Sequence, residues 1–165
     1  MNDYRAITHS LNKSNFMTQS FWLFGSCLTI LADRTTTDGQ YDLIEGYFPL
    51  GTQTPLHRHT RYFEQLYVLE GELTVWAGEK KVVLSRGESF LIPVGTPHVV
   101  AAIGDQPAHG LVIAAPSGFA QLIAVTGTQN KAETPDMALF ASISAEIGDE
   151  ILGPPGTLPS AATKT

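Results

Sequence analysis

Three histidines and one glutamate have a spacing that suits metal binding. His57 and His59 lie two residues apart, Glu64 follows in the next apolar run, and His98 comes directly after a proline. Side chains two residues apart in a β-strand face the same side, so both imidazoles of the first pair can point at one position. Three imidazoles and a carboxylate suit Fe, Ni, Co, Mn, Cu or Zn. We therefore predict that His57, His59, Glu64 and His98 hold one divalent transition metal per chain.

Glu64 stands in an apolar run where a carboxylate is unusual. Leu66 and Val68 share its strand parity, so Glu64 points inward if they line the core. A buried carboxylate is costly unless a cation compensates it. Four protein ligands leave one or two positions open on the ion for substrate or dioxygen. Taken singly, each histidine is more often an ordinary side chain, so the prediction depends on all four together.

The elements expected to position these residues are short β-strands. About nine apolar runs between Phe21 and Ala114 alternate with turn residues, a pattern typical of a sandwich or barrel. Phe21–Ala32 is expected to form one of these strands. Gly71 and Gly95 are expected to adopt positive φ in turns. We predict an all-β barrel over residues 20–115, preceded by an N-terminal arm over residues 1–19.

The composition changes after Ala115, where helices are expected. A first helix is predicted to begin near Pro116 and run to Val125. Thr134 is a candidate N-cap for a second helix, because it precedes a proline and an acid, and Gly148 is a natural end. We expect residues 116–165 to form one or two helices on the outside of the barrel, followed by a flexible tail.

Charge and composition limit the partners. The chain has 10 basic and 16 acidic residues and no cationic cluster beyond Lys80 and Lys81, which argues against nucleic acid. Its longest apolar stretch is interrupted and too short to cross a membrane. Cys27 is the only cysteine and has apolar neighbours, so we expect an inert thiol and a cytoplasmic location.

The glycine framework resembles that of the cupin superfamily. The first cupin motif is matched at every interval by Gly51, His57, His59, Glu64 and Gly71. The second is matched by Gly87, Pro93, Gly95 and His98. Ala102 stands where the second motif has asparagine, so the metal ligands remain but the pocket is expected to lack a polar group. The resemblance implies a cupin double-stranded β-helix, or jelly-roll barrel.

A finer resemblance connects the chain with quercetin 2,3-dioxygenase-like monocupins, which have a single barrel. It is carried by Pro55–His59, Tyr67–Leu73 and Ala115–Phe119, followed by a helical C-terminal part. It implies a dioxygenase that cleaves a flavonol-like or other enolic small molecule with dioxygen. In the mechanism that it implies, Glu64 is the catalytic base that accepts the hydroxyl proton of the substrate, either as a ligand that loosens from the metal or as a base beside the ligands. It also implies a homodimer, for which Phe21–Ala32 offers an apolar edge.

Two other functions remain open from the residues. The same ligands would serve a non-redox isomerase, lyase or cyclase acting on a small carbonyl compound, or a barrel that binds a small molecule without turnover. Five aromatic residues are candidates to line the pocket, although each is more often core or dimer contact: Tyr47, Phe48, Tyr62, Trp76 and Phe90. His109 is expected to be structural and His9 to lie in the arm. Arg58 is expected to point away from the ligands, and Arg61 is expected to be a solvated loop charge.

Overall fold

The computed structural model describes residues 18–160, in which eleven strands and two helices form a double-stranded β-helix. One sheet has, in order across it, β1 (Gln19–Leu23), β2 (Ser26–Ala32), β3 (Asp42–Phe48), β10 (Ala108–Ala115), β5 (Phe63–Glu70) and β8 (Ser89–Ile92). The other has β11 (Asp149–Gly153), β4 (Leu56–His59), β9 (His98–Ala101), β6 (Glu72–Ala77) and β7 (Lys80–Ser85). The predicted cupin fold is confirmed.

The core lies between the two sheets and follows strand alternation. In β5, Leu66 and Val68 are 1% and 0% exposed, whereas Tyr67 between them is exposed. Each fully buried aliphatic side chain of this kind stabilises the fold by about 1.5–3 kcal/mol. Because Glu64 has the same parity, packing of this strand carries its carboxylate inside the barrel.

The expected single strand Phe21–Ala32 is two strands joined by a tight turn. Phe24 and Gly25 have φ angles of 48° and 81°, and Leu23 pairs with Ser26 across the turn. Positive φ at both central residues matches the twist of an antiparallel hairpin. The prediction was wrong because long apolar segments flank Gly25 and Ser26 on both sides, and a phenylalanine at a positive φ gives no turn signal.

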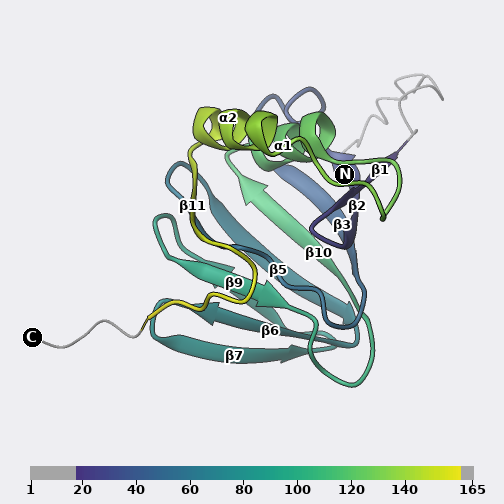
Figure 1. Ribbon diagram of the computed structural model, residues 1–165, viewed down its shortest axis with the longest axis vertical. Coiled ribbons are helices and arrows are strands. Elements are labelled where there is room, and N and C mark those ends of the chain that lie inside the picture. The colour runs from purple at the N-terminus through teal and green to yellow at the C-terminus, as the bar shows by residue number, and fades with distance from the viewer. Residues whose placement is uncertain (1–17, 161–165) are drawn as a thin grey trace, which may run out of the picture.

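Two helices cover one end of the barrel (Figure 1). Helix α1 (Phe119–Thr126) begins three residues later than expected, and its buried side chains include Leu122 and Ile123. Helix α2 (Met137–Ile147) is capped by Asp136, whose side chain accepts hydrogen bonds from two backbone N–H groups. The prediction of Thr134 as N-cap was therefore wrong by two residues. The predicted end at Gly148 is confirmed, with φ of 88°.

Strand β11 was not predicted. Directly after Gly148 the chain turns back and pairs antiparallel with β4, placing Asp149 opposite His59. Backbone hydrogen bonding supports this return, since the N–H of Thr60 donates to the carbonyl of Gly148 at 2.8 Å. A segment close to the C-terminus thereby becomes the edge strand next to the histidine pair.

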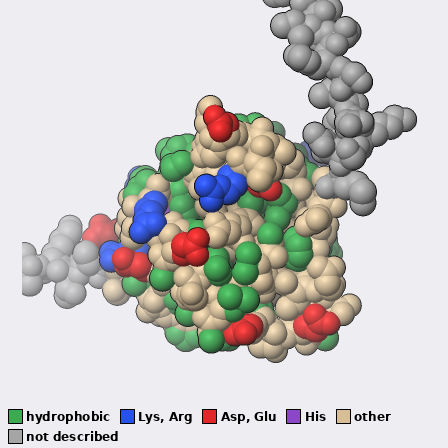
Figure 2. All heavy atoms as spheres, turned by 90° about the horizontal axis from the view of Figure 1, so that it is seen from above, with side chains coloured by type: hydrophobic (Ala, Val, Ile, Leu, Met, Phe, Trp, Pro, Cys, Tyr) green, Lys and Arg blue, Asp and Glu red, His purple; other side chains and the backbone are tan. Residues whose placement is uncertain are grey.

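Some expectations lie outside the described residues, namely His9, most of the arm expected over residues 1–19, and residues 161–165. Among residues 18–160, neither helix has the length and hydrophobicity that a membrane crossing requires. Viewed from the helix side, acidic and basic side chains are interspersed with apolar ones (Figure 2).

Candidate metal site

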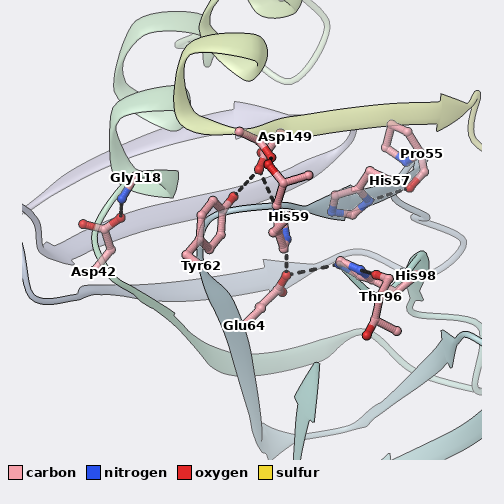
Figure 3. A network of polar contacts seen from close by, with 12 residues as sticks. Asp42, Pro55, His57, His59, Tyr62, Glu64, Thr96, His98, Gly118 and Asp149 are labelled. Atoms are coloured by element: carbon pink, nitrogen blue, oxygen red, sulfur yellow. Dashed lines mark hydrogen bonds and ion pairs between the residues drawn. The ribbon is translucent and has the colours of Figure 1, made fainter. Parts of the chain in front are cut away.

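The structure brings the four predicted ligands together inside the barrel. His57 and His59 come from β4, Glu64 from β5 and His98 from β9. One ligand atom from each lies within 4.8 Å of all the others, so this group could hold a metal ion. The topology explains the meeting, because β4 pairs with β9 at His57 and His98 while β5 belongs to the facing sheet. Figure 3 shows the side chains converging.

Backbone carbonyls orient two of the imidazoles. The Nδ1 of His57 lies 2.8 Å from the carbonyl of Pro55, and the Nδ1 of His98 lies 2.9 Å from the carbonyl of Thr96. A carbonyl only accepts, so each Nδ1 carries the hydrogen and donates it. The neutral tautomer then leaves Nε2 of each ring with a free lone pair toward the cluster. Outer contacts of this kind fix ligand orientation in metal sites.

Asp149 orients the third imidazole and was missed by the sequence analysis. Its Oδ1 lies 2.7 Å from Nδ1 of His59 and accepts a 2.7 Å hydrogen bond from the hydroxyl of Tyr62. The Tyr62 ring also stacks on His59, with centroids 4.2 Å apart. Burial and the nearby Asp149 raise the pKa of Tyr62, so its hydroxyl stays a donor. An acid just after a helix-ending glycine gives no local signal for this role.

The cluster is electrostatically uneven. Burial, together with the neighbouring His98 and His59, lowers the pKa of His57 to about 3. Burial also opposes charge on His59, but its hydrogen bonds to Asp149 and Glu64 outweigh this and raise the pKa to about 9. Burial favours a neutral Glu64, yet its contacts with His59 and His98 hold the pKa well below its usual range. Glu64 is therefore ionised at neutral pH, His57 is a free base, and His59 carries a proton.

The donors present fit a divalent transition metal. The Nε2 of His98 is buried and has no hydrogen bond within the described residues, although Glu64 Oε2 lies 3.3 Å away in poor alignment. Such orphaned buried atoms are rare in proteins. The Nε2 of His59 lies 2.8 Å from the same oxygen. An ion among these atoms would satisfy His98, and imidazole and carboxylate are suitable ligands for it.

A cavity of about 80 Å³ adjoins the cluster. Its polar lining includes His57, Glu64 and Asp149, whereas most of the remaining wall is apolar. Of the five aromatic residues considered from the sequence, only Phe48 lines this cavity. Ala102 is fully buried in the core and is not part of the wall, so the expected loss of a polar group from the pocket is not found here.

The other charged residues near the ligands point elsewhere. The Arg58 side chain is 40% exposed and its Nε donates to Glu150 at 2.7 Å, so it points away from the ligands, as expected. The Arg61 guanidinium donates to the carbonyl of Glu146 at 2.7 Å, so this loop charge is engaged with the end of α2. His109 pairs with Glu45 at 2.8 Å, away from the cluster.

Comparison with known proteins agrees with this geometry. Residues 45–114 match the family model described as Cupin domain. The chain contains a cupin domain. It is 32% identical over 69 residues to quercetin 2,3-dioxygenase of Bacillus subtilis and 35% identical over 65 residues to an uncharacterized protein of Methanocaldococcus jannaschii. These matches cover 42% and 39% of this chain, but only 20% and 52% of the two relatives.

Two solved cupin-like structures share the fold. The structure of KdgF from Halomonas sp. superposes with a TM-score of 0.53 at 22% identity, covering 64% of this chain and 90% of that one. An RmlC-like cupin from Shewanella frigidimarina has a TM-score of 0.54 at 22% identity, covering 61% and 86%. At this identity the likeness supports the barrel architecture alone.

Proposed function

We propose that this protein is a metal-dependent dioxygenase that cleaves a flavonol-like or other enolic small molecule. The observation that carries the proposal is the cluster of His57, His59, Glu64 and His98 at the wall of an apolar cavity. The partial similarity to quercetin 2,3-dioxygenase supports the choice of chemistry. A bound divalent ion would supply Lewis acidity and, when redox-active, a means of engaging dioxygen.

The side chains divide the work. His57, His59 and His98 would hold the ion, and the hydrogen bonds on Nδ1 keep the three rings in place. Glu64 approaches the imidazoles of His59 and His98 through Oε2 only, and among the described residues its Oε1 has no hydrogen bond. Since Glu64 also lines the cavity, Oε1 is available to accept the hydroxyl proton of an enol. The apolar walls exclude water from the resulting anion.

The overall reaction needs no electron donor besides the substrate. A dioxygenase places both oxygen atoms of dioxygen in the products, and here the enol supplies all four electrons as its carbon–carbon bonds are broken. No reductant site is therefore required. Removing the hydroxyl proton makes the enol electron-rich enough to react, so we assign the decisive proton transfer to Glu64.

The test is oxygen uptake by protein reconstituted separately with Fe²⁺, Mn²⁺, Co²⁺, Ni²⁺, Cu²⁺ or Zn²⁺. We expect oxygen uptake with an enolic substrate only when the bound ion is redox-active. His98→Ala should lose both the metal ion and the oxygen uptake. His109→Ala is the matched control, because this histidine lies outside the cluster. Ion-loaded protein that consumes no oxygen with quercetin or smaller enols would refute the dioxygenase. Turnover without oxygen or with zinc would instead identify an isomerase, lyase or cyclase, and tight binding without product a binding protein.

Self-association and a cytoplasmic location belong to the same proposal. Strand β1 lies at an edge of the six-stranded sheet, where an edge strand of a second copy could pair with it. Cys27, the only cysteine, suits a reducing compartment. A solution mass equal to that of one chain would contradict the homodimer.

A further inference from the structure

The helical end of the molecule supplies a wall of the cavity beside the metal cluster. Phe119 and Leu122 come from α1 and Phe140 from α2. Leu122 and Phe140 are 3% and 4% exposed, so they are held in place by packing. Residues outside the barrel therefore limit what can lie next to Glu64.

The cavity is small for a flavonol. Sites for drug-sized ligands generally measure about 300–1,000 Å³, whereas this one measures about 80 Å³. A flavonol has a fused ring pair and a third ring, so it exceeds this volume and would crowd the walls that α1 and α2 supply. A molecule with a single ring or a short chain occupies less volume and suits the same cavity better.

The charges around the cavity disfavour anions. Glu64 and Asp149 both contribute to its lining, and no lysine or arginine does so among residues 18–160. Two carboxylates balance the double charge of a divalent ion, which leaves no net attraction for a carboxylate or phosphate group. Such a group would also lose its hydration against apolar walls.

We propose that the substrate is a small uncharged enol with one ring or a short chain. Its oxygen atoms would face Glu64 and His57, and its apolar part would lie against α1 and α2. Leu122 and Phe140 then determine substrate size. This inference rests on the proposed metal-dependent function and narrows it, since it excludes intact flavonols and acidic substrates.

Three probes with the same hydroxy-ketone unit test size and charge separately. Maltol carries this unit on one ring, comenic acid adds a carboxylate to a similar ring, and quercetin carries the unit within three rings. Binding to Co²⁺-loaded protein is measured by calorimetry. We expect maltol to bind at least about tenfold more tightly than either other probe, as a pocket that rejects misfitting groups can achieve.

Variants on one helix test the assignment of the wall. Leu122→Ala should narrow the preference for maltol over quercetin by about tenfold, because it removes three carbons from the cavity wall. Val125→Ala, on the same helix but 44% exposed and outside the wall, should leave the preference unchanged. Leu122→Val provides a milder change if the alanine variant unfolds, as followed by thermal denaturation, and should shift the preference in the same direction.

The results distinguish failure of the substrate assignment from failure of the proposed metal-dependent function. Ion-loaded protein that binds quercetin or comenic acid as tightly as maltol overturns the inference and leaves the metal-dependent function standing. An unchanged preference in folded Leu122→Ala and Leu122→Val overturns the role of α1. Protein that takes up neither Co²⁺ nor any of the other five ions refutes the proposed function, and the inference falls with it.

Discussion

Two buried carboxylates in this protein have opposite kinds of surroundings. Asp42, at the start of β3, accepts hydrogen bonds from the Ser117 hydroxyl and from the backbone N–H groups of Gly118 and Ala120, the latter two at 2.8 and 2.9 Å. Glu64, on β5, meets imidazole nitrogens instead. Figure 3 places both acids in one view.

The difference lies in what the partners can do besides donate hydrogen. A backbone N–H at a helix start has no other role, so Asp42 acts as the cap that α1 lacks locally, because its own N-cap residue is Gly118. An imidazole nitrogen can exchange its proton for a metal ion. A buried acid is therefore structural when only fixed donors surround it, and a functional candidate when its partners are themselves ligands.

The largest expected effect comes from changing each acid to its amide. Glu64→Gln should weaken metal affinity at least about 100-fold, because loss of a ligand exceeds the 10–100-fold typical of outer partners. Asp42→Asn should retain the ion but lower the free energy of unfolding by roughly 2–4 kcal/mol, since the new amide hydrogens face donors. Metal analysis after dialysis and urea unfolding measure the two effects. If Asp42→Asn loses the ion as Glu64→Gln does, the distinction between the acids is wrong.

Asp149 is intermediate between these two acids. It is hydrogen-bonded to one predicted metal ligand, His59, but is not itself one of the four ligands. Asp149→Asn should weaken metal affinity about 10–100-fold by removing the charge behind His59. The visible spectrum of the Co²⁺-loaded protein should shift as well, since the ring is less firmly oriented. Glu150→Gln is the matched control on the same strand.

The control variant Glu150→Gln should leave the metal site unchanged. Glu150 pairs with Arg58 at the surface, where both side chains are about half exposed, so its loss should change stability by less than about 1 kcal/mol. The ion content and the Co²⁺ spectrum should not change. Equal effects of the two variants on metal affinity would mean that pairing of β11, and not the Asp149 carboxylate, supports the site.

Sequence reasoning found the ligands because they obey local periodicity. His57 and His59 share a strand face, and Glu64 shares the parity of Leu66 and Val68, so burial of the strand predicts burial of the acid. The family motif then supplied His98. The order of short strands and turns likewise predicted the barrel.

Asp149 escaped because nothing near it in the sequence refers to His59, which is 90 positions away. Its position depends on β11 pairing with β4, and a five-residue strand after a glycine has almost no signal of its own. The hairpin at Phe24 escaped for a related reason, because tertiary packing stabilises a backbone angle that phenylalanine rarely adopts. Long-range pairing was the information that the sequence alone lacked.

A smaller effect concerns pH. With a pKa near 9, His59 is protonated at pH 7 in the metal-free protein, whereas His57, with a pKa near 3, is not. Metal uptake at pH 7 should therefore release about one proton, and apparent affinity should fall about tenfold for each pH unit from 9 to 7. Calorimetry in two buffers of different ionisation enthalpy counts the protons. Affinity that does not change over this range would mean that His59 is already neutral.

The smallest expected effect on the metal site comes from placing a buried polar group where no polar partner is available. Ala102→Asn restores the residue of the second cupin motif, but Ala102 is fully buried in the apolar core. The new amide would be crowded and unpaired, so stability should fall by about 1–3 kcal/mol while metal content stays the same. Ile103→Asn introduces the same residue one position further, where the side chain is 49% exposed, and should change stability by less than about 0.5 kcal/mol. Urea unfolding distinguishes the two. If Ala102→Asn is more stable than the unchanged protein, or binds the ion more tightly, the core can accommodate the motif asparagine. The claim that an amide at this position is crowded and unpaired would then be wrong.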